Sequence, residues 1–202
     1  MMTPQRLVGM LAALAAVMVA ACGGGGGGGG GNDPTGGIDR GGITLAQGPI
    51  NGFGSVIVNG VRYSTAGATV TIDDQPGTES DLRVGQVVRV EGTVNADGVT
   101  GTARKVSFND EVEGPVQSID LAASRFVVLG QTVSVGAGTS FDDSIVPRSL
   151  EGVQAGMRVE VSGLVGADGV IAATRVERKS ASATVEVKGT AESVDAAARR
   201  LR

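Results

Sequence analysis

An internal repeat is the feature that most restricts how this chain folds. The segment Val84–Gly92 recurs as Ala155–Gly163, and Asn95–Val99 recurs as Gly166–Val170 with the same separation along the chain. Chance similarity between valine-rich segments would not preserve one separation, so the two pairs indicate duplication of a structural unit. The sequence therefore predicts two consecutive copies of one small domain.

The repeat also sets the expected domain limits. The opening of the first copy, Gly48–Ile50, has its counterpart in Gly114–Val116, and a third opening segment at Lys188–Asp195 echoes Glu113–Asp120. The expected domains are therefore a first β repeat at 48–112, a second at 113–187 and a truncated third at 188–202. We expect residues 182–194 to lie along the second repeat, and the last residues to fray or form a short helical turn.

Apolar positions alternate with polar ones in the long central segment of each copy: Val88, Val90 and Val94 in the first, and Met157, Val159 and Val161 in the second. A period of two is typical of strands with one buried face and one solvent face. The sequence therefore predicts an all-β fold.

Turn residues separate the expected strands. Asn59-Gly60 lies between two short apolar runs and predicts a type I′ hairpin turn, because both residues adopt positive φ readily. Gly130-Gln131 is expected to take the matching place in the second copy, as a type II′ turn that begins with glycine. Residues 96–98 and 167–169 are expected to close a further hairpin in each copy.

Two stretches lack alternation, at 77–83 and 144–154, and they are centred on Leu82 and Leu150. Each is expected to form a short helix or a plugging loop. Hairpins, then a helix or loop, then another hairpin is the element order of a small OB-like β-barrel, in which closure removes exposed sheet edges. A pair of β-sandwich modules is the alternative architecture.

The segments Gly52–Tyr63 and Val84–Gly92 together resemble the bacterial domain-of-unknown-function family numbered 5666. The resemblance spans residues 48–187 as two tandem copies. The first copy is closer to the family pattern, because the second lacks its Phe-Gly-Ser stretch. The resemblance implies an exported or lipid-anchored bacterial protein, and it supplies no catalytic residues.

The N-terminus predicts export and lipidation. Residues 1–21 combine a basic start with a short apolar segment, which is typical of a secretory signal peptide rather than a membrane span. Val19–Cys22 resembles the lipobox of bacterial lipoproteins, so Cys22 is the expected lipidated residue; an ordinary signal cleavage site is the alternative. Gly23 in second place implies sorting to the outer membrane, facing the periplasm. The glycine-rich stretch 22–47 predicts a flexible tether.

Composition excludes several activities. The chain has a net charge of −4, and loss of Arg6 with the signal peptide makes the mature protein more acidic, which disfavours nucleic acid as a partner. It contains no histidine and a single cysteine, so disulfides, histidine-based triads and ordinary zinc sites are excluded. No cofactor, metal or catalytic residue is predicted.

Carboxylates are the remaining candidates for chemistry. The repeated pairs Asp73-Asp74 and Asp142-Asp143 follow strand-like runs, where aspartate commonly begins a turn, and we interpret them as turn residues rather than as catalytic acids or Ca²⁺ ligands. The acidic cluster Asp110, Glu111 and Glu113 at the junction of the repeats is interpreted as a solvated linker.

Two functional hypotheses follow. The first is a noncatalytic lipid-anchored envelope protein that binds an envelope protein, peptide or glycan or has a structural role. The second is a carboxylate-dependent enzyme that acts on envelope carbohydrate. The first is favoured, because the paired aspartates are interpreted as turn residues and aromatic residues are few.

Overall fold

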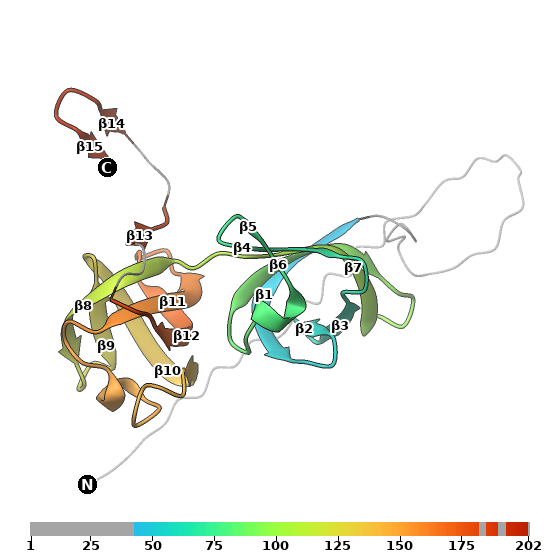
Figure 1. Cartoon of the computed structure of the whole chain (residues 1–202), viewed down its shortest axis with the longest axis horizontal. Coiled ribbons are helices and arrows are strands. Elements are labelled where there is room, and N and C mark those ends of the chain that lie inside the picture. Colours follow the sequence, from blue (N-terminus) through green and yellow to red (C-terminus); the bar gives the residue numbers. More distant parts are fainter. Residues whose placement is uncertain (1–42, 182–184, 190–192, 202) are drawn as a thin grey trace, which may run out of the picture. The chain divides into compact units, whose positions relative to one another are not determined.

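The computed structural model describes residues 43–181, 185–189 and 193–201 (Figure 1). The expected signal peptide, Cys22 and almost all of the expected tether lie outside the described residues. No helix within these ranges has the length and apolar character that a membrane crossing requires.

The first repeat is a seven-stranded sheet in which five strands close into a barrel. Its elements are β1 (Thr44–Gly52), β2 (Val56–Val58), β3 (Val61–Ser64), β4 (Thr69–Ile72), β5 (Gln75–Gly77), the 3₁₀ helix η1 (Glu79–Asp81), β6 (Val87–Val94) and β7 (Thr100–Phe108). β1 pairs antiparallel with β2 and with β6, and β6 pairs with β7. The barrel closes where β3 and then β4 pair parallel with β7.

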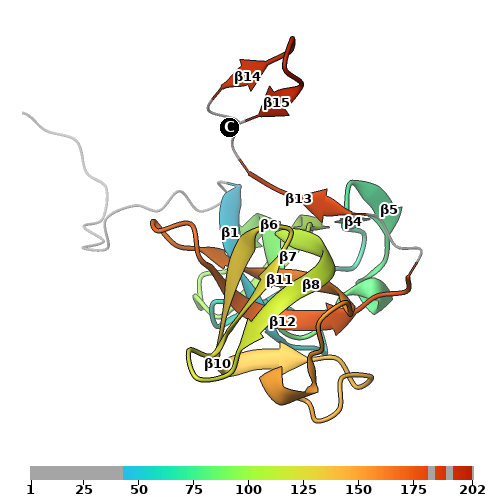
Figure 2. The same ribbon diagram turned by 90° about the vertical axis from the view of Figure 1, so that its left-hand side faces the viewer.

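The second repeat closes in the same way (Figure 2). Its elements are β8 (Val112–Asp120), β9 (Arg125–Val128), β10 (Gln131–Phe141), the 3₁₀ helix η2 (Leu150–Gly152), β11 (Arg158–Val165) and β12 (Ile171–Arg178). β10 pairs parallel with β12, and β8 pairs with β11. In each barrel, antiparallel hairpins are joined by a parallel strand pairing, which is the strand order of an OB-like barrel. The prediction of an OB-like fold is therefore confirmed. The sandwich alternative is wrong, because each sheet closes on itself.

Each barrel has its own core of small branched side chains. Valines from all sides of the first barrel pack around Tyr63 and Phe108, and those of the second pack around Phe126 and Phe141. Four of the five aromatic residues are thereby buried, and Phe53 is the exception. Alternation between core and solvent along each strand gives one apolar face, as the period of two predicts.

The turns match the sequence expectations in one copy and correct them in the other. Asn59 and Gly60 have φ of 51° and 80°, which confirms the type I′ turn. In the second copy the turn residues are Leu129 and Gly130, with φ of 49° and 79°, so the predicted Gly130-Gln131 turn is wrong by one position. Leu129 adopts this unusual conformation because its side chain packs over Gly114 and against the core.

The stretches without alternation form short 3₁₀ helices with plugging side chains. η1 lies within 77–83 and η2 within 144–154, as expected. Leu82 and Leu150 are buried. Both leucines therefore belong to a barrel core, and in the second stretch Ile145 and Val153 are buried with Leu150.

The C-terminal segment departs from expectation. Strand β13 (Glu186–Val187) pairs with the start of β8, so this part does lie along the second repeat. Val194 does not: it belongs to β14 (Val194–Asp195), which forms a hairpin with β15 (Arg200–Leu201), and Val194 is 68% exposed. A hairpin therefore replaces the expected frayed end.

Candidate functional site

The paired aspartates are turn residues. Asp73 and Asp74 form the two-residue turn between β4 and β5, with φ of 47° and 59°. Asp142 accepts a hydrogen bond from the Ser144 backbone amide at 2.9 Å, and Asp143 forms an exposed ion pair with Arg148. Both pairs therefore have the local geometry that the sequence predicted.

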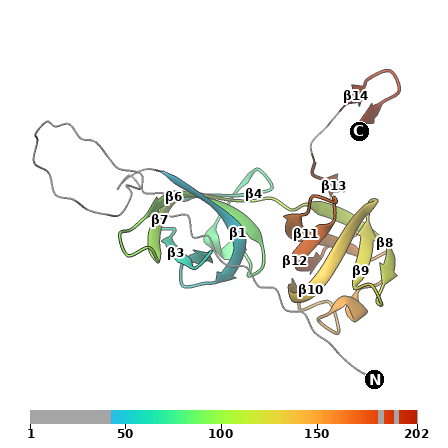
Figure 3. The same cartoon turned by 180° about the vertical axis from the view of Figure 1, so that it is seen from behind.

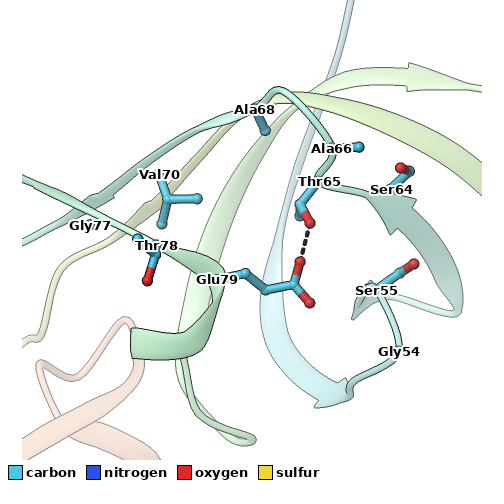
Figure 4. Close-up of a pocket in the computed structure, with 10 residues that line it drawn as sticks. All are labelled: Gly54, Ser55, Ser64, Thr65, Ala66, Ala68, Val70, Gly77, Thr78 and Glu79. Carbon is cyan, nitrogen blue, oxygen red and sulfur yellow. Dashed lines mark hydrogen bonds between the residues drawn. The ribbon is translucent and has the colours of Figure 1, made fainter.

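An open cleft on the first barrel is a candidate site for ligand binding (Figure 4). It has a volume of about 560 Å³. Three segments line it: the β1–β2 turn, the chain between β3 and β4, and the start of η1. The β1–β2 loop of OB-like barrels is a common binding element, so the cleft has a location suited to recognition.

Four hydroxyl-bearing residues line the cleft, together with small apolar residues. Ser55 and Ser64 lie on one side, and Thr65 and Thr78 extend the polar rim. The side chain of Glu79 crosses the cleft in Figure 4 and accepts a hydrogen bond from the Thr65 hydroxyl. Glu79 is the one carboxylate among its lining residues. The lining therefore offers hydrogen-bond donors and acceptors with a single negative charge.

A second hollow of about 530 Å³ adjoins this cleft through Glu79. It is lined by Phe53, Ser80, Leu82 and Arg83 in addition to Glu79. Phe53 is 42% exposed. We refer to the two hollows together as the Glu79 cleft. An accessible aromatic ring beside a hydroxyl-lined hollow offers a surface for stacking in addition to hydrogen bonds.

Local hydrogen bonds fix the η1 side of the Glu79 cleft. The Asp81 carboxylate accepts bonds from the Thr78 hydroxyl at 2.8 Å and from the Thr78 amide at 2.9 Å, and these bonds lower the pKa of Asp81. The Arg83 guanidinium donates to the carbonyls of Ser80 and Leu82. These contacts hold the cleft wall in one conformation before any ligand arrives.

The interpretation of the junction as a solvated linker is wrong, because Asp110 is buried and Glu111 and Glu113 are half-buried. Asp110 is only 2% exposed, and its Oδ2 has no hydrogen-bond partner. The reason is strand pairing: Asp110 directly precedes the part of β8 that β11 and β13 cover from both sides. Asp110, although part of a short polar linker, is therefore buried beside the sheet of the second barrel.

Burial governs the protonation of this cluster. Desolvation, reinforced by the nearby carboxylates of Glu160, Asp73 and Glu186, raises the pKa of Asp110 to about 7, while Lys188 opposes the shift. Burial likewise raises the pKa of Glu160, although its carboxylate accepts a 2.5 Å bond from Lys179. Asp110 is therefore the carboxyl group here that titrates near neutral pH.

This cluster does not have the geometry of a metal centre. Across the described ranges, no group of three or more cysteine or acidic side chains is arranged to hold a metal ion. Protonation of Asp110 at mildly acidic pH reduces the repulsion between the carboxylates without a metal ion.

No motif in the sequence predicts the Glu79 cleft. Its hydroxyls come from three separate loops, and such loops are ordinarily polar for solubility alone. One signal was present: Phe53 lies in a turn, outside the alternating positions that the barrel buries. An aromatic residue outside the alternating core positions is therefore the sequence feature that could have indicated the Glu79 cleft.

Comparison with protein families gives a match over most of the described chain. The model of the domain of unknown function DUF5666 matches residues 43–107 and again 113–177, which correspond to the two barrels. Comparisons with curated proteins and with solved structures found no match. The chain therefore belongs to the DUF5666 family, of which it carries two tandem copies.

Proposed function

We propose that this chain is a noncatalytic, lipid-anchored protein of the cell envelope that binds a glycan in the Glu79 cleft. The observation that carries the ligand class is the combination of hydroxyl-bearing side chains with the accessible ring of Phe53. Sugars present hydroxyl groups at their edges and apolar C–H groups on their faces. The hydroxyl side chains can hydrogen-bond to the former, and the Phe53 ring can stack on the latter.

The anchoring part of the proposal rests on the sequence. The apolar segment before Cys22 and the small residues beside it support lipidation of that cysteine after export. Gly23 supports outer-membrane sorting, with the barrels in the periplasm. The glycine-rich stretch would then let the barrels reach a polymer that lies some distance from the membrane.

Binding is favoured over hydrolysis of the glycan. Glycosidases ordinarily require two carboxyl groups on opposite sides of the scissile bond. Glu79 is the one carboxylate among the residues lining the cleft, and the neighbouring carboxylate of Asp81 is engaged by Thr78. The arrangement supports holding a saccharide without cleaving it.

The test uses the mature chain carrying Cys22→Ala, which is soluble for measurement, and cell-wall glycan fragments. We expect binding in titration calorimetry, and a loss of affinity of about tenfold in Phe53→Ala, from a stacking contribution of ~1–3 kcal/mol. Glu79→Gln should also weaken binding. Leu121→Ala, which changes another exposed apolar residue, serves as the matched control.

Two results would count against this function. Unchanged affinity in both Phe53→Ala and Glu79→Gln would show that the glycan does not bind in the Glu79 cleft. Release of shorter saccharides by the parent chain, abolished in Glu79→Gln, would show an enzyme instead.

A further inference from the structure

The second barrel has an edge that accepts an added strand. β9 pairs with β8 only from Val116 onward, which leaves one edge of the first half of β8 to other partners. Strand β13 occupies it: Val187 lies opposite Val112 and Glu186 opposite Glu113, and the Lys188 amide donates to the Glu111 carbonyl at 3.0 Å. This edge is therefore a docking position for an extended segment.

The first barrel has the same edge. β1 pairs with β6 from Thr44 to Pro49, whereas β2 pairs with it only from Ile50 onward. In Figures 1 and 3 the start of β1, in blue, extends past β2. No strand among the described residues pairs with the outer edge of this first half.

Hydrogen bonding places the two edges in register. Ile50 exchanges both of its backbone bonds with Gly85 and Gln86, just as Val116 does with Gly156 and Met157. Ile50 therefore corresponds to Val116. Counting back along both strands, Gln47 corresponds to Glu113 and Leu45 to Glu111.

The same alternation shows which groups point outward. Because the Ile50 amide and carbonyl face the β6 side, those of Leu45 and Gln47 face the opposite edge. The Asn59 side chain donates to the Gln47 carbonyl at 3.0 Å and covers that one acceptor. This hydrogen bond does not involve Leu45, which is exposed. The backbone groups of Leu45 are therefore available for pairing with another strand.

Charge distinguishes the two edges. In the second barrel Glu186 lies opposite Glu113, which itself lies opposite Glu160. Glu160 lies opposite Glu177 in turn, so four glutamates share one row across the sheet. Like charges directly opposite one another destabilise strand pairing. Glu113 Oε1 is also buried without a hydrogen-bond partner. Glu186 is therefore poorly placed on this edge, whereas Lys188 lies near the carboxylates of Asp110 and Glu111.

The corresponding rows of the first barrel complement β13. Gln47 lies opposite Arg89, and Leu45 lies opposite Glu91. In the register that β13 uses on β8, Glu186 would join the row of Arg89 and Lys188 would join the row of Glu91. Glu186 would then lie directly opposite the neutral Gln47 instead of Glu113, which removes the repulsion between the two glutamates.

We propose that the outer edge of β1, Leu45–Gln47, accepts the Val185–Lys188 segment of a second copy of this chain by antiparallel strand addition. Main-chain hydrogen bonds provide the attachment, and the Arg89 and Glu91 rows set the register. Two copies linked in this way exchange β13, so the Glu186 of each copy leaves the glutamate row of its own second barrel. The Asn59 side chain moves aside when the strand binds.

The test measures self-association of the mature Cys22→Ala chain by analytical ultracentrifugation. We expect a concentration-dependent dimer whose dissociation constant rises at least threefold in Arg89→Glu. Adding Glu186→Arg to Arg89→Glu should recover part of the lost affinity, because the opposite charges are exchanged. Recovery is partial because the same change removes the repulsion from Glu113 in the chain's own second barrel. Leu45→Pro, which removes an outward-facing amide at an edge position where proline is tolerated, should abolish the dimer. Circular dichroism establishes that each variant is folded.

Cross-linking separates exchange from docking within one chain. In the Cys22→Ala background, Gln47→Cys with Glu186→Cys should give disulfide-linked dimers, whereas Glu113→Cys with Glu186→Cys reports docking on the chain's own second barrel. A chain that stays monomeric at every concentration tested would overturn the proposal. So would a dimer that is unaffected by Leu45→Pro and by the Arg89 charge reversal. Capture of a different protein at position 47, without dimers, would also overturn it.

Discussion

Gly163 lies so close to Ala172 that a Cβ atom at position 163 would be 2.6 Å from the Ala172 carbonyl oxygen. Gly92 has the same relationship to the Thr102 carbonyl in the first barrel. Both glycines lie where the register of the long hairpin shifts, between β11 and β12 and between β6 and β7. The shift brings two backbones together, which explains why the repeated segment ends in glycine in both copies.

Gly163→Ala should therefore destabilise the second barrel. The added methyl meets a backbone atom that cannot rotate away, at an expected cost of ~1–3 kcal/mol. Thermal unfolding should show a melting temperature lower by at least about 4 °C. Gly136→Ala is the matched control, because a Cβ there meets open space. Equal stability of the two variants would contradict the close approach.

Asp110 should make stability depend on pH around neutrality. Its pKa is about 7 in the folded chain, against 3.8 ordinarily, so the folded state holds a proton that the unfolded state releases. The stabilisation is complete below pH 3.8 and is lost as the pH rises through 7. Asp110→Asn, which cannot ionise, should remove that loss, so its advantage over the parent chain should grow from pH 5 to pH 8.

Denaturant titrations of both chains at several pH values measure this difference. Asp143→Asn is the control, because the Asp143 side chain is 85% exposed. A parallel pH dependence in the parent and Asp110→Asn chains would show that Asp110 ionises normally.

Asp74 should be replaceable by glycine but not by valine. Its φ of 59° lies in the left-handed region, which glycine adopts freely and β-branched residues strongly disfavour. We expect Asp74→Val to lose ~1–2 kcal/mol and Asp74→Gly to stay near the parent stability. Neither should alter glycan affinity beyond what unfolding explains. Loss of affinity in a stable Asp74→Gly chain would assign this carboxylate a binding role.

Cys22→Ala should abolish membrane attachment. A lipidated cysteine is the proposed anchor, so the variant should accumulate as unlipidated precursor or as soluble periplasmic protein. Metabolic labelling with a fatty-acid analogue, followed by membrane fractionation, measures both effects. Ser182→Ala serves as the control. Label that persisted on Cys22→Ala would show that the lipid is attached elsewhere or that no lipobox is used.

Alternation and turn chemistry were enough to predict the barrel architecture, because both are local. Val88 and Val90 reveal a buried face from their spacing alone, and Asn59-Gly60 encodes its turn in two residues. The turn at Leu129 could not be predicted this way. Its left-handed backbone is stabilised by contact with Gly114, a residue that the chain brings close only after folding.

The functional faces were harder to predict for the same reason. Asp110 looked solvated because its neighbours in sequence are acidic, yet its environment comes from β11 and β13. The Glu79 cleft combines loops whose residues are ordinary when considered separately. Only Phe53 departed from its local pattern, and one aromatic residue in a turn does not define a site.

The parallel closure of each barrel has a consequence for folding during synthesis. β7 and β12 are the last strands of their barrels, yet they pair with β3 and β4 in one case and with β10 in the other. Closure must therefore wait until the ribosome has released the final strand. Until then the earlier hairpins have no partner along one side, and such non-local pairing is slow to form. A chain that folds late in this way stays threadable for longer, which is the state that transport through a narrow channel requires.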